Sequence, residues 1–234
     1  MPSANLVQTS FDSARLSRLA SIAHPMREPG HWRLEAHGAR GLRVQAFDII
    51  VREGGAPRVA VDVAPTNPAD QSRAVGDRLL APHGMINLSI SAGGGGAFAL
   101  LYGARASEPV WDSRVLEPGD HYACMPLRPG SYVVSNVSGD ARAALRVNYP
   151  DPRAIAQGNR LASGPVHLKI GRAITPGDQR IDPGQVLVFA IETRSHLSVA
   201  LETADDGPPD LAEWRAARNR DCLRAAFAYA RRRK

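Results

Sequence analysis

Apolar and polar residues alternate with a period of two along much of this chain, which is typical of β-strands with one buried face. The alternation is clearest in four segments, 59–63, 86–91, 166–170 and 197–201. The segment 186–191 is apolar at almost every position, which indicates a strand covered on both faces. The pattern therefore predicts a fold built mainly from short strands.

Four copies of one tetrapeptide, an apolar residue, any residue and then Pro-Gly, separate several of these strands. The copies are 116–119, 127–130, 174–177 and 181–184, and 80–84 is a looser fifth. Proline presets φ at the first corner of a type II turn, and glycine supplies the positive φ of the second. Each copy predicts a tight reversal, so the expected fold class is all-β, an antiparallel, jelly-roll-like β-sandwich.

The segment 42–63 predicts two local features. The phase of the alternation reverses between Ala46 and Phe47, which indicates a β-bulge because one extra residue exchanges the two faces. The run Gly54-Gly55-Ala56-Pro57 then interrupts the strand, and clean alternation resumes at 59–63. We expect a hairpin that turns at 54–57.

The segments 82–101 and 183–201 share one arrangement. Each has a turn with proline, an apolar strand, a turn of small residues and a returning apolar strand. This similarity predicts two equivalent hairpins and suggests an internal duplication.

Helices are expected only near the two ends. The segment 10–23 is rich in serine and arginine and has a weak helical pattern. At the other end, Asp210 and Glu213 form a capping box that begins an alanine- and arginine-rich helix over 211–231. The expected organisation is an N-terminal helical extension at 1–30, a β-sandwich region at 31–204 with two possible sub-domains meeting near 150–165, and a basic amphipathic helix at 205–234.

Charge is a weak guide to partners. The net charge is +6 and the pI is about 9.9, but the arginines are spread along the chain and lysine occurs only at Lys169 and Lys234. The expected contact with a polyanion or a partner is therefore confined to the C-terminal cations, namely Arg224, Arg231, Arg232, Arg233 and Lys234. No apolar run predicts a signal peptide or a membrane span, so cytoplasmic synthesis is the expectation.

No catalytic or metal-binding motif is found in the sequence. The seven histidines are dispersed, and none is two or four residues from another. Neighbours such as Asp120-His121 and Ser195-His196 would point to opposite faces of a strand, which argues against their cooperation. Cys124 and Cys222 are expected to be buried free thiols. We expect no cofactor and no metal.

These observations favour a non-enzymatic structural or interaction protein, a β-sandwich component of a larger assembly such as a phage-like particle, with other subunits as partners. One alternative is a sandwich that binds a glycan or another small ligand on aromatic platforms. Its candidate residues are Trp32, Trp111 and Tyr122, with Tyr102 and Tyr132 as further aromatics. The second alternative is a metal-dependent enzyme with a β fold.

Overall fold

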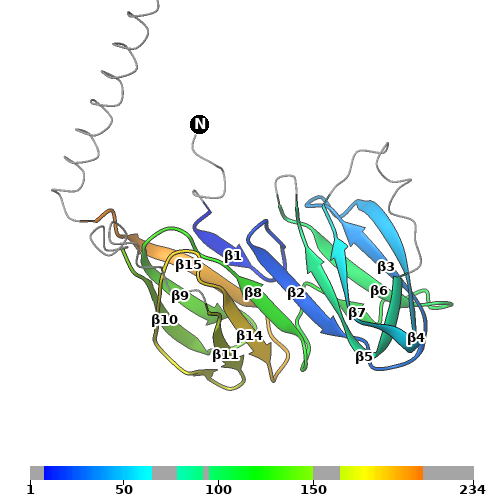
Figure 1. The fold of residues 1–234 in the computed structure, drawn as a ribbon. Coiled ribbons are helices and arrows are strands. Elements are labelled where there is room, and N and C mark those ends of the chain that lie inside the picture. Colours follow the sequence, from blue (N-terminus) through cyan, green and yellow to red (C-terminus); the bar gives the residue numbers. More distant parts are fainter. Residues whose placement is uncertain (1–7, 65–77, 92–94, 150–163, 208–234) are drawn as a thin grey trace, which may run out of the picture.

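A computed structural model describes residues 8–64, 78–91, 95–149 and 164–207, and these ranges form an all-β structure of two large sheets (Figure 1). The smaller sheet has the order β1 (Ser10–Asp12), β15 (Leu197–Ala204), β9 (Gly130–Asn136), β10 (Arg142–Val147), β13 (Gln179–Ile181). The larger sheet has the order β12 (Ile174–Thr175), β11 (Val166–Ile170), β14 (Leu187–Ile191), β8 (His121–Cys124), β2 (Ala20–Pro25), β5 (Arg78–Ser89), β4 (Arg43–Asp62), β3 (Gly30–His37), β6 (Phe98–Gly103), β7 (Trp111–Asp112).

The all-β prediction is confirmed, but the sheets are not purely antiparallel. Three pairings are parallel, those of β4 with β5, β10 with β13 and β11 with β14. A parallel pair needs a crossover connection between its strands, so a rule based on tight reversals alone does not anticipate it.

The prediction of an N-terminal helix at 10–23 is wrong. Strands β1 and β2 occupy this segment. Leu16, which lies between these strands in the chain, forms an isolated bridge with Ala97. Ile22 is fully buried between the partner strands β5 and β8, so tertiary pairing overrides a weak helical pattern. The C-terminal helix and the 150–165 boundary fall outside the described residues, and both stay predictions.

Two of the four Pro-Gly copies form the predicted turns. In the first, Gly119 has φ 99° and the Asp120 amide donates to Glu117 O at 2.9 Å. In the second, Gly184 has φ 83° and the Gln185 amide donates to Asp182 O at 3.1 Å. In the other two copies, Gly130 begins β9 directly with φ 150°, and Gly177 has no positive φ.

The prediction of a hairpin that turns at 54–57 is also wrong. Strand β4 continues through this region, and both of its ends pair parallel with β5, at Val51 with Leu80 and at Val61 with Leu88. The glycines permit a bend and a close approach, since a Cβ on Gly55 would lie 2.2 Å from the backbone carbon of Leu80. The predicted bulge is confirmed close by, because the register between β3 and β4 shifts at Val44.

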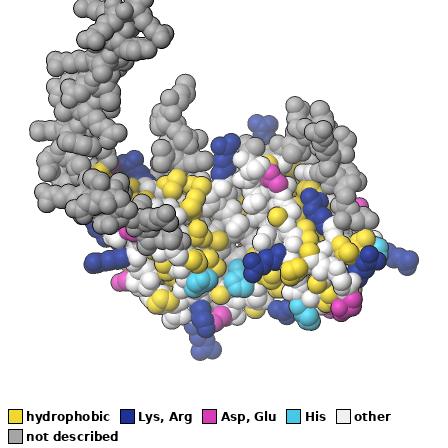
Figure 2. Space-filling view, in the orientation of Figure 1, with side chains coloured by type: hydrophobic (Ala, Val, Ile, Leu, Met, Phe, Trp, Pro, Cys, Tyr) yellow, Lys and Arg dark blue, Asp and Glu magenta, His cyan; other side chains and the backbone are white. Residues whose placement is uncertain are grey.

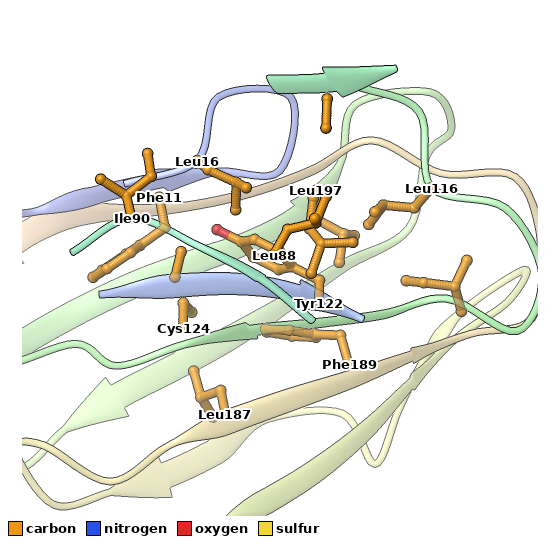
Figure 3. Close-up of a cluster of buried hydrophobic side chains, with 14 of the residues drawn as sticks. Phe11, Leu16, Leu88, Ile90, Leu116, Tyr122, Cys124, Leu187, Phe189 and Leu197 are labelled. Atoms are coloured by element: carbon orange, nitrogen blue, oxygen red, sulfur yellow. The ribbon is translucent and has the colours of Figure 1, made fainter. Parts of the chain in front are cut away.

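One part of the hydrophobic core combines residues of both sheets (Figure 3). Phe11 and Leu197 from the smaller sheet meet Leu88, Tyr122 and Phe189 from the larger one. All five side chains are at most 1% exposed. On β5 and β15 the inward residues are those that the alternation assigned to one face. On β14, expected to be covered on both faces, Leu187, Phe189 and Ile191 are buried, whereas Val188 and Ala190 are half-buried.

The chain contains two structural repeats, β1–β6 (the first repeat) and β7–β15 (the second repeat). From Phe11 and Trp111 to Trp32 and Tyr132, equivalent residues are offset by 100 positions, as with Ser13 and Ser113. The Ser13 hydroxyl accepts from Leu197 N at 2.9 Å and the Ser113 hydroxyl from Ala99 N at 2.8 Å. The duplication suggested by the sequence is therefore present in the hydrogen bonds, but the two expected hairpins are wrong, because β5 does not pair with β6 and β14 does not pair with β15.

The two repeats are joined at equivalent strands and exchange their first strands. Strand β2 pairs antiparallel with β8, and Ile22 lies opposite its own equivalent, Tyr122, which places a pseudo-twofold axis between them. Strand β1 pairs with β15 of the second repeat, whereas β7 pairs with β6 of the first. Each repeat is therefore completed by the other (Figure 1).

The close approach at Gly55 gives the first prediction. Gly55→Ala should lower the free energy of unfolding by more than about 1 kcal/mol, because the new methyl group meets the backbone of β5. Thermal unfolding followed by circular dichroism measures the change. Gly177→Ala is the matched control, since nothing lies within 4 Å of its Cβ position. Equal melting temperatures for the two variants would contradict the packing of β4 on β5.

Candidate functional site

A cleft of about 560 Å³ opens where the two repeats meet, beside the end of the β2–β8 pairing. Its volume is within the range of small-molecule sites. Both repeats contribute to its lining, which consists of His24, Pro25, Met26, Arg27, Glu28, Trp32, Leu101, Val110, Trp111, Glu117 and Pro118. Two of the three ligand-binding candidates from the sequence, Trp32 and Trp111, are therefore brought together here.

The buried carboxylate of Asp120 organises one wall of the cleft. The carboxylate is 1% exposed and accepts three hydrogen bonds: from His24 Nδ1 at 2.7 Å, from Trp111 Nε1 at 3.0 Å and from Glu117 N at 2.8 Å. The Pro-Gly turn at 117–120 fixes its position, and Asp120 O accepts from Ile191 N of β14 at 3.0 Å. A buried carboxylate with this set of donors is a rigid centre for the surrounding rings.

The His24 imidazole is held in position by Asp120 and Trp111. It lies one register position beyond the last β2–β8 pair, opposite Asp120, and its ring stacks on Trp111 with centroids 4.3 Å apart. Because an ionised carboxylate only accepts hydrogen bonds, the imidazole hydrogen lies on Nδ1. His24 is one of the residues that line the cleft.

The indole of Trp32 forms another part of the cleft lining. Trp32 lies on β3, between Ile49 of β4 and Gly103 of β6, and is half-buried. Its Nε1 is buried and has no hydrogen-bond partner. A buried N–H without a partner is costly, so Trp32 is a residue that packing alone does not fully satisfy.

The equivalent place in the second repeat is closed and apolar. Phe11 stands for Trp111, Ala20 for Asp120, Cys124 for His24 and Tyr132 for Trp32, and all four are at most 6% exposed. The Tyr132 hydroxyl donates to Arg128 O at 2.8 Å, so its own repeat satisfies it. One place therefore carries an open cleft and its equivalent is filled by side chains.

Charges at the rim of the cleft nearly cancel. Glu28 and Glu117 contribute carboxylates, and the Arg27 guanidinium donates to Pro118 O at 3.0 Å. Arg194 pairs with Glu117 at 3.3 Å, which offsets the second carboxylate. The rim therefore has no excess of positive charge that would favour an anion.

The remaining aromatic candidates lie elsewhere. Tyr122 is fully buried in the core, and burial raises the pKa of its hydroxyl well above the usual value. Tyr102 is on β6 beneath the guanidinium of Arg33, 5.0 Å from the ring centroid. Tyr132 is buried in the closed equivalent place, where burial raises its pKa to about 12. None of the three lines the cleft.

The C-terminal cations Arg224, Arg231, Arg232, Arg233 and Lys234 lie outside the described residues, and their role stays a prediction. On the face drawn in Figure 2, Lys and Arg side chains are scattered among apolar and acidic ones. This view agrees with the even spread of arginine along the sequence.

The acid and histidine neighbours in the sequence do not act together. Asp120 binds His24, whereas His121 Nδ1 is buried without a partner. His196 Nε2 pairs with Asp12 at 2.6 Å, and the Ser195 hydroxyl donates to Thr193 O. Within the described ranges, no group of three or more His, Cys, Asp or Glu side chains is placed to hold a metal ion.

Sequence reasoning missed His24 and Asp120, which are 96 positions apart. A signal for them exists, however. When the chain is aligned with itself at the offset of 100, most core positions keep their character, but His24 faces Cys124 and Asp120 faces Ala20. Polar residues that replace apolar ones in only one repeat mark the site.

Comparison with family models, curated proteins and solved structures finds no match to this chain. Among the residues that the structure describes, no helix has the length and hydropathy needed to cross a membrane. The function is therefore argued from the cleft itself.

The Asp120 centre gives the second prediction. Asp120→Asn should lower the free energy of unfolding by about 1–3 kcal/mol, because an amide nitrogen would face the donors that the carboxylate now satisfies. Urea denaturation measures the change. Asp206→Asn is the control, since Asp206 forms an exposed pair with Arg128 and should change stability by at most about 1 kcal/mol. Similar losses in both variants would show that Asp120 is not an organising centre.

The closed equivalent place gives the third prediction. Burial raises the pKa of the Cys124 thiol, so little thiolate forms at neutral or mildly alkaline pH. In a Cys222→Ser background, native protein at pH 8 should not react with Ellman's reagent within the time in which urea-unfolded protein reacts completely. Fast reaction of the native protein would mean that this place is open.

Proposed function

We propose that the protein binds a small organic ligand in the cleft between its two repeats. Two indoles and an imidazole form its walls, and Met26 and Leu101 add apolar surface. Small-molecule sites typically combine such apolar and aromatic walls with a few fixed polar groups. Asp120 fixes two of the three rings, so little ordering is left to occur on binding.

The difference between the two repeats is the observation that carries this proposal. The same backbone position holds Tyr132 with its hydroxyl satisfied in one repeat, and Trp32 with an unpartnered N–H in the other. A purely structural role would be served by the closed arrangement in both places. The polar residues are concentrated where the cleft opens, which supports a binding role there.

The fourth prediction tests this function with a fragment library that holds neutral, cationic and anionic small molecules. Ligand-observed NMR should find compounds that bind the full-length protein and bind Trp32→Ala about tenfold more weakly or worse, a loss of about 1.4 kcal/mol. Tyr132→Ala is unsuitable as a control because it would empty the core, so Tyr132→Phe is used. Binding to that variant should be unchanged.

Two outcomes would overturn the proposal: no compound binds at millimolar concentration, or the compounds that bind do not distinguish Trp32→Ala from the wild type. Thermal melting of each variant shows whether lost binding reflects a lost fold.

We also retain the proposal that the two sheets form a jelly-roll-like β-sandwich that is a non-enzymatic component of a larger assembly with other subunits. The all-β architecture is consistent with such a component. Ligand binding and assembly are compatible roles for one protein. The mass of the native complex, with its co-purifying proteins identified, tests assembly, and a monodisperse monomer without partners would exclude it.

A further inference from the structure

We infer that the chain forms a twofold homodimer in which the outer edge of β4, over 58–62, pairs with the same edge of a second copy. This inference rests on the proposed assembly role and gives that role a partner and a surface. It does not involve the cleft. It follows from an edge that is left unpaired, from the order of charges along this edge, and from the covered state of the equivalent edge in the second repeat.

Strand β4 has one unpaired edge in its last part. The pairing of β4 with β3 covers only the part from Arg43 to Val51. Over 58–62, β4 pairs with β5 on one side, and no strand in the described part of the chain pairs with it on the other. The side chains of Arg58 and Ala60 are exposed, so this part of β4 is accessible. An unpaired edge of this kind offers backbone donors and acceptors to another chain.

The backbone groups of Arg58, Ala60 and Asp62 point away from β5. Val63 N donates to Ser89 O of β5 at 2.9 Å, and the backbone groups of successive residues alternate in direction along a strand. Every second residue before Val63 therefore faces β5, and the residues between them face the open edge. These outward groups are the ones that a second strand would pair with.

The order of charges along this edge is complementary to itself. In an antiparallel pair with its twofold axis at Ala60, Arg58 of each copy lies opposite Asp62 of the other. Both side chains are on the same face of the strand as Ala60, so guanidinium and carboxylate meet across the axis. An axis at Arg58 or at Asp62 would place like charges opposite each other, which disfavours those registers.

The Asp62 carboxylate is fixed in position before this contact forms. Its Oδ1 accepts from Ala64 N at 2.9 Å and from Ser91 N at 3.2 Å, and its Oδ2 accepts from the Ser91 hydroxyl. A carboxylate offers about four acceptor positions, so Oδ2 can still accept from a guanidinium. Because this carboxylate is already ordered, the contact requires ordering of the arginine alone.

The equivalent edge of the second repeat is covered. Strand β11 corresponds to this part of β4, because β11 pairs parallel with β14, which pairs with β8, just as β4 pairs parallel with β5, which pairs with β2. Strand β12 pairs with β11 at Lys169 and Ile170. The Lys169 side chain is exposed, and a lysine at an edge opposes pairing with another strand. Within the described ranges, the edge at 58–62 has neither protection.

Sedimentation velocity of the full chain tests the inference at protein concentrations from about 1 to about 200 μM. A contact through one strand edge is small, so we expect a reversible dimer with a Kd of about 1–100 μM. Ala60→Pro removes the N–H at the twofold axis, and the pairing with β5 does not use that N–H. This variant should associate at least about tenfold more weakly.

His167→Pro is the matched control. His167 occupies on β11 the place that Ala60 occupies on β4, and it is exposed. Its N–H also faces away from the neighbouring strand, because Val166 N donates to Val186 O, next to β14, at 2.8 Å. Proline at this position should leave association unchanged.

Arg58→Glu tests the charge pairing. It places carboxylates opposite each other on both sides of the axis, so association should weaken about 2- to 10-fold. An unchanged dimer would overturn the twofold register at Ala60. Circular dichroism and thermal melting show whether each variant is folded, and Arg58→Glu decides if Ala60→Pro does not fold.

The outcomes separate this inference from the assembly proposal. No self-association over the concentration range overturns the inference, and the native complex mass then decides whether other proteins are the partners. A dimer that Ala60→Pro does not weaken forms through another surface, which overturns the inference and keeps the assembly role. Equal weakening by Ala60→Pro and His167→Pro would show that the β4 edge is not the specific contact, and would overturn the inference as well.

Discussion

The pairing of β2 with β8 is the constraint on which the rest of the structure depends. It joins the two repeats at equivalent residues, Ile22 and Tyr122, in the middle of the larger sheet. Because the strands are antiparallel, equivalent pairs of positions lie on either side of this point. One such pair is Ala20 with Cys124, and the other is Asp120 with His24. The geometry thus provides two places of the same backbone shape, and side-chain chemistry alone decides what each becomes.

This arrangement explains how a site can arise in a protein without recognisable catalytic motifs. The apolar pair, Ala20 and Cys124, continues the core, and Phe11 and Tyr132 cover it. At the other pair, a buried carboxylate requires donors, and two of its three donors are rings that line the cleft. The same interactions therefore satisfy the buried charge and orient the walls. The stability of a buried carboxylate and the geometry of the proposed binding site depend on one set of hydrogen bonds.

The sequence predicts the local features of this fold better than its long-range ones. Alternation identified the strands, because burial of one face places apolar residues at every second position, as at Ile86, Leu88 and Ile90. It failed at 10–23, where pairing with distant strands decides the structure, and at 54–57, where glycines allow a bend instead of a reversal. Trp32 and Trp111 stood out as aromatics, but His24 and Asp120 acquire meaning only through a contact across the repeat boundary.

The exchange of β1 and β7 ties the two repeats mechanically as well as chemically. Each of these short strands forms its ladder with the last strand of the opposite repeat. If the connection between β6 and β7 were cut, the two fragments would still be joined by the β1–β15 and β6–β7 pairs and by the central β2–β8 pair. Neither repeat could separate without losing a strand that pairs with it. The protein should therefore unfold in a single cooperative step, and not one repeat at a time.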